Sequence, residues 1–215
     1  MSEPLNVNKQ TSIVLATRNQ GKIRELAGLM RPFNLQVFGL EDFPDVPEIE
    51  ETGKTFAENA LLKACGVSRA TGLIAVADDS GLEVDVLGKA PGIYSARYSQ
   101  TPETAATDAG NMEKLLAEMD GVPDEQRGGR FRCCIAACAP SGEHLLAEGA
   151  WEGSIAGSPA GSNGFGYDPV FFDKEKGCTA AQMSREEKNS RSHRARAVSA
   201  LLEHWPAFWQ ACGKR

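Results

Sequence analysis

Two adjacent carboxylates, Asp78 and Asp79, are the strongest candidates for chemistry in this sequence. They follow the short apolar run 73–77, which predicts a central strand with both acids at its carboxyl end, where open α/β sheets bind ligands. Two ionised carboxylates side by side repel each other unless a cation, a shared proton or solvent relieves them. With one further acid they would form a plausible Mg²⁺ site, and the candidates are Glu48, Glu50 and Glu51. An Asx-type turn over Ser80-Gly81 is an equally good interpretation.

A polar turn between a predicted strand and a predicted helix is the second candidate. Its residues are Thr17, Arg18, Asn19, Gln20, Gly21 and Lys22. Free backbone N–H groups and the helix dipole favour a phosphate at such a helix start, and Lys22 adds a positive charge. The turn nearly matches a Walker A loop, but Ile23 stands where a Ser or Thr hydroxyl must reach Mg²⁺, which argues against a Walker NTPase. Taken alone, the segment is more often an ordinary turn with a solvated lysine.

A glycine-rich loop and a basic segment complete the candidates. The loop 157–166 holds four glycines and leads into Phe165, Gly166, Tyr167 and Asp168, which would let the backbone approach a base while an aromatic ring stacks on it. The alternative is a flexible surface loop whose aromatic residues pack in the core.

The basic segment 184–196 holds five Lys/Arg against two Glu in an otherwise acidic chain, which suggests an anionic ligand. A solvated helical face is the alternative, and His193 fits an exposed histidine equally well. No Ser-His-Asp or Cys-His arrangement can be argued, since neither His144 nor His204 has a nucleophile or metal partner nearby in the sequence.

The elements that must position these residues follow from hydrophobic periodicity. The sequence predicts strands over 12–17, 35–39, 73–77 and 82–87, a loop over 41–51, a hairpin of 130–139 with 143–156, and helices over 21–30, 101–119, 195–211 and from Thr55 past Val67. No repeat or linker divides the chain. This mix predicts an α/β fold in which helices flank a mixed β-sheet, with two lobes and a groove between them.

Composition limits the classes of function. The 215 residues carry 23 Lys+Arg and 29 Asp+Glu, so the net charge is −6, which argues against a protein that mainly neutralises nucleic-acid phosphates. We expect a flexible extension over 1–11 and a single domain over 12–212. No signal sequence or membrane span is recognisable, so a cytoplasmic protein is expected. The six cysteines lack CxxC spacing, and Cys133, Cys134 and Cys138 are expected to be reduced strand or core thiols.

Together these segments resemble the dITP/XTP pyrophosphatase family, which is also called the inosine triphosphate pyrophosphatases. The resemblance runs from about Ile13 to about Leu202. It rests on Ala16-Thr17-Arg18-Asn19-Gln20-Gly21-Lys22, Glu50-Glu51-Thr52-Gly53, Phe56-Ala57-Glu58-Asn59-Ala60, Asp78-Asp79-Ser80-Gly81-Leu82, Pro91-Gly92-Ile93-Tyr94-Ser95-Ala96-Arg97-Tyr98, Gly164-Phe165-Gly166-Tyr167-Asp168-Pro169 and Ser192-His193-Arg194. Each motif is weak alone, whereas all of them in this order are specific.

The resemblance implies Mg²⁺-dependent hydrolysis of ITP, dITP or XTP to the monophosphate and pyrophosphate, by a homodimer that binds no nucleic acid and no membrane. By likeness, Asp79 is the general base or a metal-bound carboxylate, Glu51 is a metal ligand, and Asp78 is a further candidate ligand. Lys63 is a catalytic candidate that, with Lys22 and Lys188, would face phosphates. The substrate-binding residues that the resemblance implies are Thr17, Arg18, Asn19, Gln20, Gly21, Lys22, Ser80, Phe165, Gly166, Tyr167, Asp168, Lys188, His193 and Arg194.

The chemistry of a triphosphate agrees with this assignment. A nearly fully ionised triphosphate repels a nucleophile, so cations must surround it while one carboxylate orients water. Donors from His193 and Arg194 would accept a 6-oxo purine and reject adenine, whose 6-amino group is itself a donor. The alternatives are a pyrophosphatase with another base preference, a catalytically silent nucleotide-binding module and a nucleic-acid-binding protein.

Overall fold

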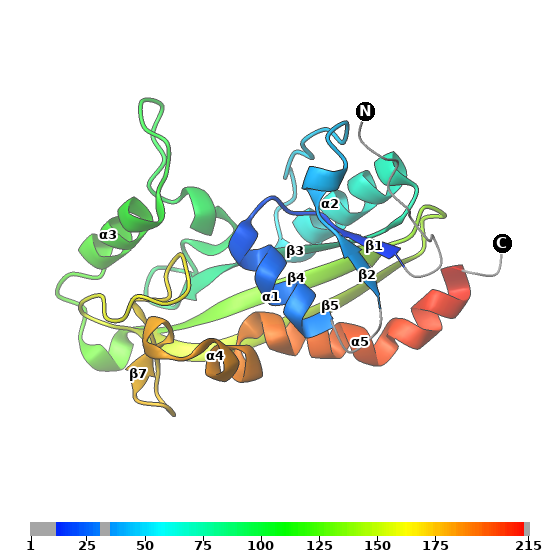
Figure 1. Ribbon diagram of the computed structural model, residues 1–215. Helices are drawn as coiled ribbons and strands as arrows, with labels where there is room; N and C mark the ends of the chain where they lie inside the picture. The colour runs from blue at the N-terminus through cyan, green and yellow to red at the C-terminus, as the bar shows by residue number, and fades with distance from the viewer. Residues whose placement is uncertain (1–11, 31–34, 213–215) are drawn as a thin grey trace. The chain divides into compact units, whose positions relative to one another are not determined.

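The computed structural model describes residues 12–30 and 35–212, so the extension expected over 1–11 lies outside the described residues. The strands are β1 (Ser12–Leu15), β2 (Gln36–Phe38), β3 (Ile74–Val84), β4 (Gly128–Cys138), β5 (His144–Ile155), β6 (Phe171–Asp173) and β7 (Cys178–Thr179). The helices are α1 (Gln20–Met30), α2 (Phe56–Thr71), α3 (Asp108–Glu118), α4 (Arg185–Arg191) and α5 (His193–Cys212), as Figure 1 shows. Short 3-10 helices cover Leu40–Asp42, Gly92–Arg97, Asp124–Gln126 and Ala180–Gln182. None of the helices in this described part is long and apolar enough to cross a membrane.

All seven strands belong to one mixed sheet in the order β2-β1-β3-β4-β5-β6-β7. Strand β1 runs parallel to both β2 and β3, while β6 runs antiparallel to β5 and β7. The α/β class and the mixed sheet are therefore confirmed. The predicted hairpin is also confirmed, because β4 and β5 are neighbours in the sheet and the turn at Ser141-Gly142 joins them.

The described chain divides into two compact units. Unit 1 contains the described residues up to Asp78, then Ile135–Ala147, and the described part of Val198–Arg215. Unit 2 contains Asp79–Cys134 and Glu148–Ala197. The division falls inside β3, so Asp78 belongs to unit 1 and Asp79 belongs to unit 2.

Unit 1 is built around the buried strand β1 and the apolar first half of β3. All four residues of β1 are buried, and Ile13 stands opposite Ile74 of β3, as expected for a parallel strand covered on both faces. Helix α2 begins where the sequence predicts, because the Thr55 side chain caps it by accepting the backbone N–H of Glu58. It ends at Gly72, whose left-handed backbone (φ 69°) suits glycine.

Unit 2 has its own apolar core around aromatic rings. Phe131 of β4, Trp151 of β5 and Phe171 of β6 lie against one another, with ring centres 4.5–6.3 Å apart. Leu115 and Met119, at the end of α3, belong to the same buried cluster. Tyr167 of the glycine-rich loop joins it as well, which ties that loop to the core.

Strand β3 differs from the expectation. The sequence predicts separate strands over 73–77 and 82–87 with a turn at Asp78 and Asp79, but β3 continues through both acids to Val84. The strand-end and Asx-turn interpretations are therefore wrong.

Three helix boundaries also differ. Helix α3 begins at Asp108 rather than 101, because the Thr101 side chain accepts the backbone N–H groups of Glu103 and Thr104 and closes a turn instead. Helix α1 begins one residue earlier than predicted, at Gln20. The basic segment forms a separate short helix, α4, before α5 begins at His193.

The prediction of reduced thiols is wrong for one of the three strand cysteines. Cys138, at the end of β4, forms a disulfide with Cys65 of α2 within unit 1. The Cα atoms are 5.1 Å apart although 73 positions separate the two residues, a pairing that spacing alone cannot indicate. Cys133 and Cys134 are buried and form no disulfide, as expected, and burial raises the pKa of Cys134 to about 12.

Candidate active site

The turn before α1 is held by its own side chains. The Asn19 side-chain oxygen accepts the backbone N–H groups of Gly21 (2.9 Å) and Lys22 (3.2 Å), and the Thr17 hydroxyl accepts that of Asn19. Asn19 thus caps the helix. The expectation of free backbone N–H groups is wrong for Gly21 and Lys22, while Arg18 and Gln20 are exposed beside them.

Two lysines and two carboxylates meet in unit 1, and we call Lys22, Glu51, Lys63 and Asp78 the lysine–carboxylate cluster. Lys22 Nζ lies 3.1 Å from Asp78 Oδ2. Lys63 Nζ donates to Glu51 Oε1 (2.7 Å) and to the backbone oxygen of Asp78 (2.8 Å). The Asp78 side chain is fully buried, whereas the Glu51 side chain is 29% exposed. The structure thus brings together four of the predicted site residues, which come from four separate segments of the chain.

Glycines allow the acidic loop to approach α2 and so position Glu51. The Gly53 N–H donates to the side chain of Asn59, which is fully buried in α2 (2.8 Å). A Cβ on Gly53 would lie 2.6 Å from that side chain, and a Cβ on Gly66 of α2 would lie 2.7 Å from Ile49. The loop therefore lies directly on the helix that carries Lys63.

Unit 2 gathers the other predicted residues around the Phe165 ring, and we call Ser80, Phe165, Asp168, Lys188 and Arg194 the aromatic–cation cluster. Lys188 Nζ lies 4.9 Å from the ring centre and Arg194 Cζ lies 5.7 Å from it. Cations over an aromatic face are attracted by the ring's electrons. The Lys188 ammonium also contacts the Asp168 carboxylate at 2.7 Å, and both side chains are almost fully buried.

Asp168 organises the glycine-rich loop. Its Oδ2 accepts the backbone N–H of Phe165 (2.9 Å) in addition to the Lys188 ammonium. Gly164 has a left-handed backbone (φ 78°), and a Cβ there would overlap Asp168 Oδ2, so only glycine fits. Tyr167 donates its hydroxyl to the backbone oxygen of Ser95 (2.9 Å), and burial raises the pKa of that hydroxyl. The alternative of a flexible loop is therefore wrong, although its expectation that an aromatic residue packs in the core is confirmed for Tyr167.

The basic segment is not a solvated face, because its functional candidates are buried. Arg194 is 2% exposed and donates Nη2 to the Ser80 hydroxyl (3.0 Å), a contact between residues 114 positions apart. His193 is 4% exposed and its ring stacks on Phe131, with centres 4.7 Å apart. An exposed His193 is therefore excluded. Asp79, on the neighbouring position of β3, is 7% exposed.

Helix caps place these basic residues. Ser184 and Glu187 form the reciprocal capping pair of α4, which presents Lys188. Ser192 accepts the Ala195 N–H at the start of α5 (3.2 Å), directly before His193 and Arg194. Two serines in a basic stretch thus predict two helix starts, a signal that the sequence-based boundaries missed.

The carboxylate oxygens of Glu51 and Asp78 are hard donors that suit Mg²⁺, which needs only one or two carboxylates beside phosphate and water. Each carboxylate contacts a different ammonium group, Glu51 that of Lys63 and Asp78 that of Lys22, so the donor set fits a small divalent cation that arrives with its own anionic ligand. Within residues 12–30 and 35–212, no three His, Cys, Asp or Glu side chains are grouped to hold a metal alone.

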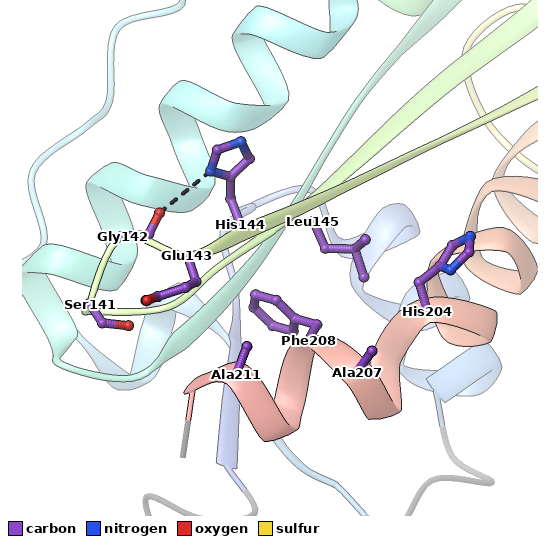
Figure 2. Close-up of a pocket in the computed structure, with 9 residues that line it drawn as sticks. All are labelled: Ser141, Gly142, Glu143, His144, Leu145, His204, Ala207, Phe208 and Ala211. Atoms are coloured by element: carbon purple, nitrogen blue, oxygen red, sulfur yellow. Dashed lines mark hydrogen bonds between the residues drawn. The ribbon is translucent and has the colours of Figure 1, made fainter. Parts of the chain in front are cut away.

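A separate cavity of about 670 Å³ lies in unit 1 between the β4–β5 turn and α5. Figure 2 shows His144, by the β4–β5 turn, apart from His204 on α5, with the Leu145 side chain between them in this view. His144 Nδ1 lies 3.4 Å from the backbone oxygen of Gly142. No predicted site residue lines this cavity, so it is distinct from the lysine–carboxylate cluster.

Comparison with known proteins identifies a family and close relatives. The Ham1 family profile matches residues 13–204. A protein of Nitratidesulfovibrio vulgaris named dITP/XTP pyrophosphatase is 61% identical over 204 residues, which cover 94% of this chain and 99% of that protein. The Escherichia coli protein of the same name is 51% identical over 193 residues, 89% of this chain and 96% of that one. A HAM1 protein from Coxiella burnetii has a similar solved structure, with a TM-score of 0.81, 41% identity, and coverage of 91% of this chain and 98% of that one.

Proposed function

The chain belongs to the Ham1 family, and from this premise we propose that it hydrolyses the non-standard purine nucleoside triphosphates dITP, XTP and ITP to the monophosphate and pyrophosphate. It is a nucleoside triphosphate pyrophosphatase that acts on the bond between the α and β phosphates. The relatives named dITP/XTP pyrophosphatase support the substrate class. The observation in this chain that carries the proposal is the lysine–carboxylate cluster, in which two lysines are held close together by two acids.

The lysine–carboxylate cluster is suited to a triphosphate because its two lysines can exchange their carboxylate partners for phosphate oxygens. Lys22 and Lys63 hold carboxylates in this structure, at 3.1 and 2.7 Å. A triphosphate offers both ammonium groups stronger anionic partners, since charge-assisted bonds to phosphate oxygens are strong. The lysines then neutralise the phosphate chain and the pyrophosphate leaving group.

Exchange also releases Glu51 and Asp78 to hold a divalent cation, which we propose is Mg²⁺. When bound, such an ion withdraws charge from the phosphate oxygens. Asp79 is the candidate for the base that orients water and takes its proton. Asp79 is 7% exposed, and because aspartates are seldom this buried, its burial is consistent with a functional role.

The aromatic–cation cluster suits a purine. We propose that Phe165 stacks on the base while His193 and Arg194 donate towards its 6-oxo edge. Adenine carries an amino donor at that position, so it would leave buried donors without acceptors. Lys188 is expected from the family resemblance to face phosphate, but its contacts with Asp168 and Phe165 favour a role beside the base.

We also propose a homodimer that works in the cytoplasm, with residues 12–212 as one catalytic domain. The single domain is supported by β3, which carries residues of both units in one strand. Light scattering on the purified protein tests the dimer.

The test of the function is product analysis by ion-exchange chromatography after incubation with Mg²⁺ and, separately, ITP, XTP, GTP or ATP. Monophosphate and pyrophosphate from ITP and XTP, with little product from GTP or ATP, are expected. Diphosphate and orthophosphate would place attack at the γ-phosphorus and refute the mechanism. Binding of ITP without any turnover would instead identify a silent nucleotide-binding module.

A further inference from the structure

The loop that carries Phe165 donates a hydrogen bond to a residue outside the loop. The backbone N–H of Gly166 donates to Asp108 Oδ2 at 2.8 Å, although the two residues are 58 positions apart. Asp108 is the first residue of α3, and that helix ends in the buried core of unit 2 through Leu115. A rigid helix therefore holds the middle of the loop.

Three other amides in this loop have acceptors of their own. The N–H of Phe165 donates to Asp168, that of Asp168 donates to the backbone oxygen of Phe165 (3.3 Å), and that of Asn163 donates to the backbone oxygen of Ala181 (3.0 Å). Gly166 has a left-handed backbone (φ 61°). Glycine adopts this conformation easily but adopts others as easily, so glycine alone does not fix the direction of the Gly166 N–H. A hydrogen-bond acceptor outside the loop favours the left-handed conformation of Gly166, because only that conformation points the N–H towards it. Asp108 occupies this position.

Asp108 is not needed to cap its own helix. The Thr107 side chain is the cap and accepts the Gly110 N–H (3.0 Å). The Asp108 side chain is exposed, and it accepts a hydrogen bond from Gly166 in the loop. Asp108 therefore stabilises the loop rather than the start of its own helix.

We propose that Asp108 is a positioning residue for base recognition: it fixes Gly166 and thereby sets the plane of the adjacent Phe165 ring. This rests on the proposed function, in which Phe165 stacks on the purine. Asp108 acts through the loop and touches no reacting atom. Its loss should weaken binding of the base and leave the chemistry on the phosphates intact.

The test compares Asp108→Ala, Asp108→Asn and the control Glu113→Ala with the wild type, using ITP and GTP as substrates. Asp108→Ala is expected to raise KM for ITP about tenfold, as the loss of a charge-assisted hydrogen bond predicts, while kcat stays within about twofold. The preference for ITP over GTP in kcat/KM should fall as well. Asp108→Asn keeps an oxygen acceptor and should retain most of the wild-type KM.

Glu113→Ala removes the same charge from an exposed position of α3 and should change nothing. If only the charge at the helix start mattered, Asp108→Asn would be as impaired as Asp108→Ala, and this result would overturn the proposal. An unchanged KM in Asp108→Ala with an active wild type would overturn it too.

Hydrogen exchange read by mass spectrometry gives a second measurement that needs no turnover. Peptides covering 163–168 should exchange faster in Asp108→Ala than in the wild type or Glu113→Ala. Equal exchange in all three proteins would show that Asp108 does not hold the loop. A wild type that releases pyrophosphate from no nucleotide would refute the proposed function, and the exchange data would then still decide whether Asp108 holds the loop.

Discussion

The ion pair between Lys188 and Asp168 shows how single residues are used in this site. Both side chains are almost fully buried, and a buried ion pair recovers its desolvation cost only when further hydrogen bonds complete it. The Phe165 N–H supplies one such bond to Asp168. The pair thus fixes the backbone of the residue whose ring we expect to meet the base.

Asp79 is the residue whose replacement should most reduce the chemical step. Asp79→Asn keeps the size of the side chain but cannot accept the proton of the attacking water, so kcat for ITP should fall at least about a hundredfold. KM should change little, because the lysines and Phe165 remain. Pyrophosphate release measured under saturating ITP checks this. Turnover within a few fold of the wild type would show that Asp79 is not the base.

Asp173 should make the stability of unit 2 depend on pH. Burial tends to raise its pKa, but bonds from the Lys176 N–H, the Trp151 indole and the Arg191 guanidinium lower it below the usual value. A lowered folded-state pKa means that the carboxylate stabilises the fold above its unfolded pKa, about 3.9, and that this stability is lost as pH falls through the lower folded value.

Asp173→Asn should therefore cost about 3 kcal/mol at pH 7, because Arg191 loses a buried partner. The difference in unfolding free energy from the wild type should shrink below about pH 4. Urea unfolding at pH 7, 5 and 3.5 measures it. A difference that stays constant over this range would mean that the charge of Asp173 contributes nothing.

Among the elements, the glycine-rich loop should be the least tolerant of a methyl group. Gly164→Ala places a Cβ on Asp168 at a left-handed backbone position, so the loop must move. KM for ITP should rise about tenfold or more, with kcat less affected. Gly157→Ala is the matched control, because nothing lies within 4 Å of its added Cβ and its φ is not positive. Equal KM and kcat in the two variants would contradict the close approach of the Gly164 backbone to Asp168.

The elements show where sequence alone is sufficient. The cap at Thr55 and the apolar strand β1 were predictable, because each depends on neighbouring residues and on periodicity. Strand β3 was not, because Asp78, Asp79 and Gly81 have the composition of a turn, and only pairing within the sheet keeps them extended.

The site shows the same division. The family resemblance named the residues of both clusters as site residues, and the structure brings Lys63 to Glu51 in one cluster and Arg194 to Ser80 in the other. The contact of Asp108 with Gly166 could not be predicted, since it depends on where a helix begins and on a glycine's left-handed backbone.

At the scale of the whole molecule, the Cys65–Cys138 disulfide should stabilise the fold. It closes a loop across 73 positions, which restricts the unfolded chain and is worth about 2–4 kcal/mol. For a protein of this size, dithiothreitol should lower the Tm by about 5–10 °C. Calorimetry with and without reductant measures the shift.

Two cysteine variants make this result specific. Cys138→Ser should be insensitive to the reductant, and Cys178→Ser, at a half-buried free thiol, should respond like the wild type. A wild type with the same Tm in both conditions would show that the bond does not form in solution.

The discontinuous composition of the two units has a consequence for biosynthesis. Unit 1 begins first along the chain, yet it also needs Ile135–Ala147 and the described part of α5 from Val198 onwards. Both segments of unit 2, the second of which ends at Ala197 inside α5, leave the ribosome before the part of α5 from Val198 onwards. On a nascent chain, unit 2, which we propose binds the base, can therefore be complete while unit 1, which holds the lysine–carboxylate cluster, still lacks the part of α5 from Val198 onwards. A message truncated after Ala197 would encode only one finished unit.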